Sequence, residues 1–154
     1  MEAVRELLRE GVFHESSVEQ VAARAGVSRA TVYQQFGSRL GLVDAICDSL
    51  DLTAIEASPD VATLLSRTTE FWAREEALLS QLYEAAAVDP AAREFVERQT
   101  RDRYRHLEHW VDGPDLPILG LLTSFETYVE LRRRAGLSQR QVVRHLRRAA
   151  AELL

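Results

Sequence analysis

The chain has 154 residues, of which 46% are hydrophobic and 28% are charged, with a formal net charge of −5. This length supports one substantial core, or two small helical layers that share one. No apolar run approaches the roughly 18 residues that a membrane-spanning helix needs. The amino terminus also lacks the charged and apolar parts of a signal segment. We therefore expect a cytoplasmic protein with no membrane association.

The charges are distributed in a way that excludes a general polyanion-binding patch near the amino terminus. Residues 1–53 contain five arginines and eight acidic residues, which gives this segment a net charge of −3. Any anion bound there must be held by a few placed arginines, backbone N–H groups and helix amino termini. The single cysteine, Cys47, cannot form an internal disulfide, and its apolar-periodic position predicts a small buried hydrophobe.

Apolar spacing predicts an all-helical chain of about nine helices. The expected helices cover residues 2–10, 17–25, 28–36, 38–54, 59–74, 76–88, 90–111, 116–134 and 138–153. The segment 56–60, which contains Pro59, is the natural boundary between two layers. We therefore expect a first domain over residues 1–54 and a second over residues 55–154.

Capping residues define several of these helix ends. Ser17 with Gln20, and Ser138 with Gln141, have the spacing of a capping box. Ser28 is expected to cap the next helix, while Gly37 and Gly136 follow the last periodic residues of two others.

Residues 22–39 (AARAGVSRATVYQQFGSR) have the pattern of a helix-turn-helix. Gly26 makes the turn, and Val32 and Phe36 face inward. An exposed polar surface remains at the start of the second helix, formed by Ser28, Arg29, Thr31, Tyr33 and Gln34. An ordinary corner between two helices is the alternative. The exposed residues are hydrogen-bonding and aromatic rather than the glutamate and lysine of a solvated face, which favours DNA binding.

Residues 17–46 closely resemble the DNA-binding domain of TetR-family transcriptional regulators. The resemblance implies that Tyr33 and Arg39 hold phosphates, and that the rest of the chain is a helical effector-binding and dimerisation domain. The sequence departs from the family pattern at Glu19, where many members carry a DNA-contacting arginine, and at Gln34, where histidine is common. The expected DNA-contacting residues are Ser17, Arg24, Ser28, Arg29, Ala30, Thr31, Tyr33, Gln34 and Arg39. Because Met1 stands almost inside the first helix, we expect a basic lead-in before it.

Aromatic residues are frequent in the predicted middle helices. Buried tyrosine and tryptophan need partners for their polar atoms, and a ligand cavity between helices satisfies that need. The alternative is that these side chains form an ordinary core. The expected effector contacts are Phe71, Trp72, Leu82, Tyr83, Tyr104, Trp110 and Phe125.

The last two predicted helices carry more apolar surface than one neighbouring layer would cover. Pairing of two copies into a four-helix bundle would bury this surface. The alternative is that the last helix closes the core of its own domain. The expected dimer contacts are Leu122, Val129, Val142, Leu146, Ala149, Ala150 and Leu153.

No arrangement of nucleophile, base and orienting group stands out, and no glycine-rich phosphate loop is present. His106 and His109, with Asp102 one turn before, have a possible metal spacing, but neighbouring arginines would oppose a cation. We therefore expect no enzyme, no metal and no cofactor. The resemblance implies a one-component regulator, a repressor that binds a palindromic operator as a homodimer and is released by a small, largely apolar effector. The alternative second domain is a protein-interaction module without a small-molecule ligand.

Overall fold

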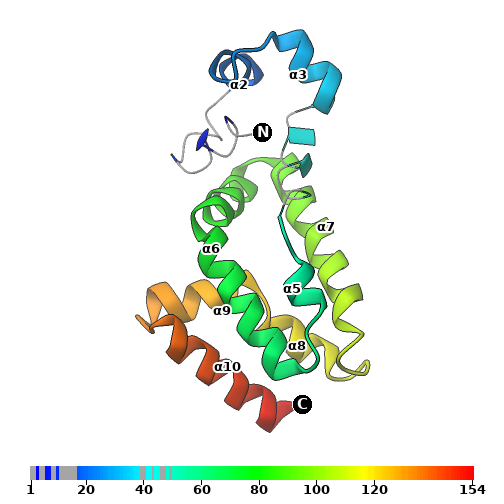
Figure 1. The fold of residues 1–154 in the computed structure, drawn as a ribbon, viewed down its shortest axis with the longest axis vertical. Coiled ribbons are helices and arrows are strands. Elements are labelled where there is room, and N and C mark those ends of the chain that lie inside the picture. The colour runs from blue at the N-terminus through cyan, green and yellow to red at the C-terminus, as the bar shows by residue number, and fades with distance from the viewer. Residues whose placement is uncertain are drawn as a thin grey trace. The chain divides into compact units, whose positions relative to one another are not determined.

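The computed structural model describes residues 3, 6, 7, 10, 17–38, 41, 42, 44, 45, 48 and 50–154. These described residues contain helices and no strands, as the sequence predicts (Figure 1). The helices are α2 (Val18–Arg24), α3 (Arg29–Phe36), α5 (Thr53–Glu56), α6 (Val61–Val88), α7 (Pro90–Leu107), α8 (Leu116–Leu122), α9 (Phe125–Val129), the π-helix η1 (Glu130–Arg134) and α10 (Gln139–Leu153). Five residues of the predicted helix 2–10 (2, 4, 5, 8 and 9) and six of the predicted helix 38–54 (39, 40, 43, 46, 47 and 49) lie outside the described residues.

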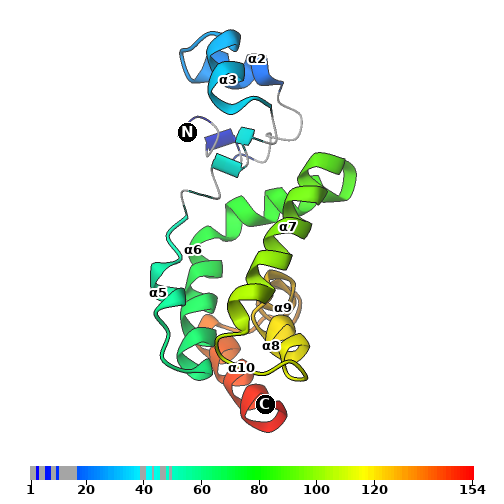
Figure 2. The same ribbon diagram turned by 90° about the vertical axis from the view of Figure 1, so that its right-hand side faces the viewer.

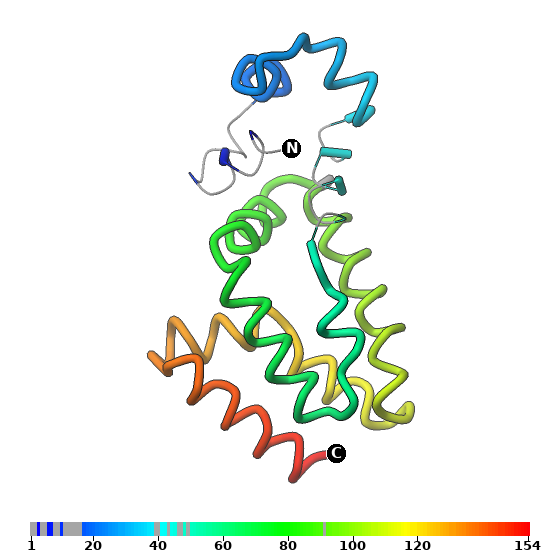
Figure 3. The backbone as a smooth tube through the Cα atoms, viewed as in Figure 1, coloured from blue at the N-terminus to red at the C-terminus, as the bar shows by residue number. Residues whose placement is uncertain are grey.

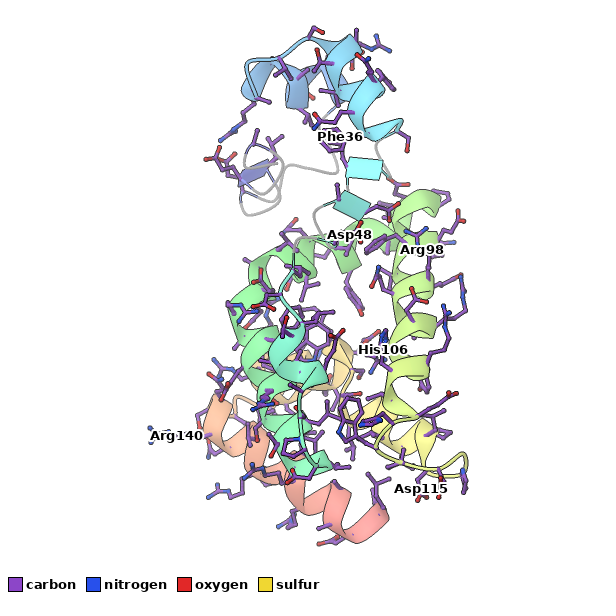
Figure 4. The ribbon with its side chains drawn as sticks, turned by 45° about the vertical axis from the view of Figure 1, so that its right-hand side comes forward. Phe36, Asp48, Arg98, His106, Asp115 and Arg140 are labelled. Carbon is purple, nitrogen blue, oxygen red and sulfur yellow. The ribbon has the colours of Figure 1, made fainter. Side chains whose placement is uncertain are left out.

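The chain forms two compact units. The first unit comprises Met1–Leu50 and Glu76–Gln99, and the second comprises Asp51–Glu75 and Thr100–Leu154. Both α6 and α7 therefore contribute residues to each unit. Within the first unit, Arg98 of α7, which Figure 4 labels, forms an ion pair with Asp44.

The predicted helix caps are confirmed. The Oγ atoms of Ser17 and Ser138 accept from the backbone N–H groups of Gln20 and Gln141, whose side chains accept from the backbone N–H groups of the serines. Gly37 and Gly136 end their helices with φ values of 69° and 67°, a conformation that side chains with a Cβ disfavour. These ends depend on contacts only a few residues apart in the chain, which is why a sequence pattern locates them.

The prediction of two helices over residues 59–74 and 76–88 is wrong, because α6 is continuous from Val61 to Val88. Its middle, Arg-Glu-Glu-Ala, contains no glycine or proline, and all four residues are good helix formers. At the other end of the predicted range 38–54, Asp51 and Leu52 are non-helical, so the helix expected there does not extend to Ala54.

The predicted helix 116–134 is interrupted at Thr123 and Ser124. The Thr123 hydroxyl donates to the Leu119 carbonyl at 2.7 Å. Ser124 takes an extended conformation, with φ −73° and ψ 150°, and its Oγ accepts from the N–H of Thr127 at 3.1 Å. A serine that bonds to the backbone in this way starts a new helix rather than continuing the old one.

The core of the second unit gathers leucines from three helices. Leu64, Leu107 and Leu119 are each at most 3% exposed, and Ile55 and Trp110 pack against them. Both views show α5 beside the first turns of α6 (Figures 1 and 2), where Arg67 Nη1 donates to the Ala54 carbonyl at 2.7 Å. The short α5 is thus held by α6.

A glycine allows the close approach of Tyr104 on α7 to α8. A Cβ built on Gly120 would lie 2.4 Å from the Cζ and hydroxyl oxygen of Tyr104. The ring therefore occupies the space that any other residue at position 120 would need.

We expect Gly120→Ala to destabilise the chain by about 1–3 kcal/mol, because the ring must leave its place to admit a methyl group. Urea unfolding followed by circular dichroism measures this cost. Gly113→Ala is the control, since a Cβ there has no atom within 4 Å. Equal stability of the two variants would show that Tyr104 moves aside freely.

Candidate nucleic-acid interface

Helices α2 and α3 form a helix-turn-helix with a short buried seam (Figure 3). Val21, Ala22 and Val32 are buried at 3%, 3% and 4% exposure. Gly26 turns the chain with φ +66°, and the N–H of Val27 donates to the Ala22 carbonyl at 3.0 Å. Burial of these small side chains fixes which side of α3 faces outward.

The outward side of α3 carries the polar residues predicted to contact DNA. Ser28 caps the helix, with its Oγ 3.0 Å from the N–H of Thr31 and 2.8 Å from the Thr31 hydroxyl. The structure exposes Ser28, Arg29, Ala30, Thr31, Tyr33 and Gln34 together. On α2, Ser17 is the amino-terminal cap and Arg24 is the last residue. Arg39 lies outside the described residues.

Arg29 is paired with an acidic residue of α2. Its Nη1 lies 2.5 Å from Glu19 Oε1, and its guanidinium carbon lies 5.2 Å from the centroid of the Tyr33 ring. Both partners of the ion pair are at least half exposed, at 60% and 50%. The arginine predicted to read bases is therefore held between a carboxylate and an aromatic ring, which is an attractive arrangement for a guanidinium.

Arg24 is also engaged by carboxylates. Its Nη1 donates to Glu10 Oε2 at 2.8 Å, its Nη2 pairs with Glu10 Oε1, and its Nε lies 3.6 Å from Glu6 Oε2. Sequence reasoning missed both sets of pairs. The signal available for Arg24 is the four-residue spacing of Glu6 and Glu10, which places the two carboxylates on one side of a helix.

The predicted effector residues fall into separate groups. Leu82 and Tyr83 belong to the first unit, and the other five residues belong to the second. Within the second unit, the Phe71 and Trp72 rings lie 5.0 Å apart, and the Trp72 and Phe125 rings lie 5.5 Å apart. Phe125 also stacks on the buried Tyr128, with centroids 6.0 Å apart. These rings form a continuous aromatic cluster, with Phe71 and Phe125 almost fully buried.

Both tryptophan indoles have hydrogen-bond partners in the protein. Trp72 Nε1 donates to the Thr123 carbonyl at 3.1 Å, and Trp110 Nε1 donates to the Ser58 carbonyl at 2.9 Å. Arg103 Nη1 donates to the Gly120 carbonyl at 2.6 Å and to the Thr123 hydroxyl at 2.9 Å. The indole N–H groups of these two predicted effector residues thus already bind backbone carbonyls of the second unit.

The predicted dimer residues are divided between core and surface. Val142, Leu146, Ala150 and Leu122 are each at most 8% exposed and pack inside their own chain. Helix α10 packs on α8 and η1, while Arg140 points outward from its other side (Figure 4). Val129 and Ala149 are partly buried, and Leu153 is 57% exposed. Leu121, which the sequence analysis omitted, is 59% exposed.

His106 on α7 and His109 in the turn after α7 have partners within the protein. His106 Nδ1 lies 2.8 Å from the Asp102 carbonyl oxygen, so this nitrogen carries the proton (Figure 4). The Asp102 carboxylate pairs with Arg105. Among the described residues, no group of three potential ligands could hold a metal ion.

The Glu19 carboxyl has a pKa below its ordinary value. A backbone hydrogen bond at Glu19 is the main cause, followed by the Ser17 hydroxyl and then the charge of Arg29. A lowered folded-state pKa favours the ionised form, so these contacts stabilise the fold above the unfolded-state pKa. Their contribution is lost as the pH falls through the folded-state pKa.

We expect Arg29→Ala to raise the pKa of Glu19 and to leave it below the ordinary value, because the backbone and Ser17 contacts remain. Carboxyl carbon shifts followed by NMR during an acid titration measure this pKa. Arg24→Ala is the control and should leave the pKa of Glu19 unchanged. If Arg29→Ala also leaves it unchanged, the ion pair does not persist in solution.

Comparison with known proteins identifies the amino-terminal region. Residues 1–46 match the family model described as "Bacterial regulatory proteins, tetR family". No curated protein and no solved structure matches the chain. In the described residues, no helix is long and apolar enough to cross a membrane. The matched segment contains α2, the turn and α3, so residues 1–46 contain a DNA-binding helix-turn-helix similar to that of tetR-family transcriptional regulators.

Proposed function

We propose that the chain is a one-component repressor that binds a palindromic operator as a homodimer and is released by a small, largely apolar effector. The observation that carries this proposal is the exposed face of α3 in a tetR-family helix-turn-helix. A recognition helix enters the major groove with its amino-terminal residues against the base edges. Ser28, Arg29 and Thr31 occupy those positions in α3.

The contacts divide by chemistry. Arg29 is suited to donate two hydrogen bonds to guanine, and Gln34 to pair with adenine. Ser17, Tyr33 and Arg39 are suited to phosphates, which fix the register of the protein without reading sequence. We propose the same phosphate role for Arg24, which must then exchange its carboxylate partners for DNA.

We expect Arg29→Ala to weaken operator binding by about 1–3 kcal/mol and to relax the preference for one base. We expect Arg39→Ala to weaken binding evenly across sequences and to reduce the salt dependence by about one phosphate contact. Selection from a randomised duplex library, followed by titration at several salt concentrations, separates the two effects. The assignment is overturned if Arg39→Ala changes the selected bases and Arg29→Ala does not.

Dimerisation is proposed because one helix-turn-helix domain, called a head below, contacts only half of a palindromic site. The exposed Leu121 and Leu153, with the partly buried Val129 and Ala149, provide apolar surface on the last helices for a second copy. Val142, Leu146, Ala150 and Leu122 would support this surface from beneath. The resemblance to tetR-family regulators supports dimerisation through this part of the chain.

We expect Leu121→Glu combined with Leu153→Glu to give a folded monomer with weak operator binding, because two carboxylates would be buried at the interface. Sedimentation velocity measures the assembly, and circular dichroism checks the fold. Val88→Glu is the matched control, since Val88 is 75% exposed and lies outside the proposed interface. A dimer that survives the double substitution places the interface elsewhere.

The second domain is proposed to bind the effector at the aromatic cluster of Phe71, Trp72 and Phe125, with Tyr104 on α7 and Trp110 in the turn that follows α7 in the same unit. Leu82 and Tyr83, which lie on α6 in the first unit, stay predicted effector contacts and are not assigned to this cluster. Effector binding would favour a conformation in which the two heads no longer fit successive major grooves, and so lower the affinity for DNA.

The hydrogen bonds of the two indole N–H groups within the protein favour a second candidate function. In it, residues 55–154 form a protein-interaction module without a small-molecule ligand. Both tryptophan N–H groups already donate to carbonyls, so neither indole needs an effector as its hydrogen-bond partner. If the domain binds an effector, some compounds in a panel of apolar and aromatic molecules should raise the unfolding temperature of the protein. The interaction module is expected to show no stabilisation by any of them.

The proposed domain division follows the two roles. Residues 1–54 would bind DNA, and residues 55–154 would bind the effector and the second copy. Because its proposed target is chromosomal DNA, we propose that the protein acts in the cytoplasm.

A further inference from the structure

We propose that Glu19 is a specificity-determining residue that acts through Arg29, holding its guanidinium for base reading and withholding it from phosphates. The proposal rests on the proposed function, because it requires that Arg29 face DNA. The juxtaposition that carries it is the 2.5 Å ion pair between Arg29 Nη1 and Glu19 Oε1 beside the Tyr33 ring.

The ion pair uses one edge of the guanidinium. An arginine has five N–H donors in a planar fork, and Glu19 binds the fork at Nη1. The Nε–H and Nη2–H donors take no part in this contact, and together they can bond to O6 and N7 of a guanine. The guanidinium carbon lies 5.2 Å from the centroid of the Tyr33 ring. Arg29 can thus read a base without leaving Glu19.

Phosphate binding by Arg29 has a different cost. The guanidinium and the carboxylate together carry no net charge, so the pair has little attraction for the DNA backbone. To bind a phosphate at full strength, Arg29 must leave Glu19 and expose a carboxylate to a like charge. Guanine acceptors are neutral and impose no such repulsion. The pair therefore weakens non-specific binding more than it weakens binding to the correct base.

The position of Glu19 offers a second route by which its carboxylate could act on DNA. Glu19 lies in the first turn of α2, next to the cap Ser17. Helix amino termini attract phosphates through their free N–H groups and dipole. A carboxylate placed there could also repel DNA directly, without any role for Arg29. These two routes differ in whether the effect of Glu19 requires the arginine.

The experiment measures a specificity ratio, the affinity for a duplex selected by the wild-type chain divided by the affinity for a scrambled duplex of equal length. Glu19→Gln removes the charge at nearly constant shape. Glu19→Asp keeps the charge at α2 but shortens the side chain by one methylene, so that the contact with Arg29 is lost. Each substitution is also made with Arg29→Ala. Glu94→Gln, at an exposed position of α7 in the first unit, controls for the change in net charge.

We expect Glu19→Gln to raise affinity for the scrambled duplex by about three- to fivefold, with a salt dependence steeper by about one phosphate contact per copy. Affinity for the selected duplex should rise less, so the specificity ratio falls. Glu19→Asp should lower the ratio as well. With Arg29→Ala in place, neither substitution at Glu19 should change the ratio, and Glu94→Gln should not change it in any background.

Several results would overturn the proposal. If Glu19→Asp keeps the wild-type ratio, or if Glu19→Gln acts equally with and without Arg29, the carboxylate acts by charge alone. If Glu19→Gln leaves the ratio unchanged while the wild-type chain selects a sequence, this proposal fails and the proposed function stands. If the wild-type chain selects no sequence, both fail. Thermal melting of each variant establishes that the fold is retained.

Discussion

The packing of α2 against α3 is the constraint on which the rest of the candidate DNA-binding surface depends. Ala22 and Val21 are small enough for the two helices to approach closely, and Val32 closes the seam from the other side. Gly26 makes the turn in a backbone conformation that a side chain with a Cβ would strain. Once this seam is buried, Arg29, Thr31 and Tyr33 have no orientation except outward. Burial of a few small apolar side chains therefore sets which residues of α3 can contact DNA.

Short-range rules explain which parts of the fold could be predicted. The capping boxes at Ser17 and Ser138 act over three residues, and their helices begin where the sequence indicates. The helix break at Ser124 also depends on local hydrogen bonds, but apolar periodicity continues through it and conceals it. The opposite difference occurs at Arg74 to Ala77, where the sequence analysis predicts a break between two helices but α6 continues through these residues. Periodicity reports which face is buried, whereas capping reports where a helix ends.

In the candidate site, the sequence predicts which residues are exposed but not which residues of different helices pair with each other. The exposure of the α3 residues follows from the position of the turn, so their sequence assignment as an exposed group is consistent with the structure. The pairing of Arg29 with Glu19 joins two helices across the turn, and no spacing rule within one helix indicates it. Burial of Leu146 on α10, which packs on α8 and η1, likewise depends on tertiary contacts that no local pattern indicates. An amphipathic stripe shows that a face is covered, but it does not show whether the cover is the same chain or a second copy.

Charge pairing changes how the affinity of this head for DNA should be understood. Residues 1–53 have a net charge of −3, and the two arginines that the structure describes there, Arg24 and Arg29, are both held by carboxylates. Such a head gains little from the counterion release that drives non-specific binding. Its affinity must come from helix amino termini, hydroxyl groups and base contacts, and each of these is small. In a dimer, the small contributions of both heads to the binding free energy would combine at one operator. Once the first head is bound, binding of the second is an intramolecular step. A weakly charged head is therefore consistent with a regulator whose affinity depends on pairing.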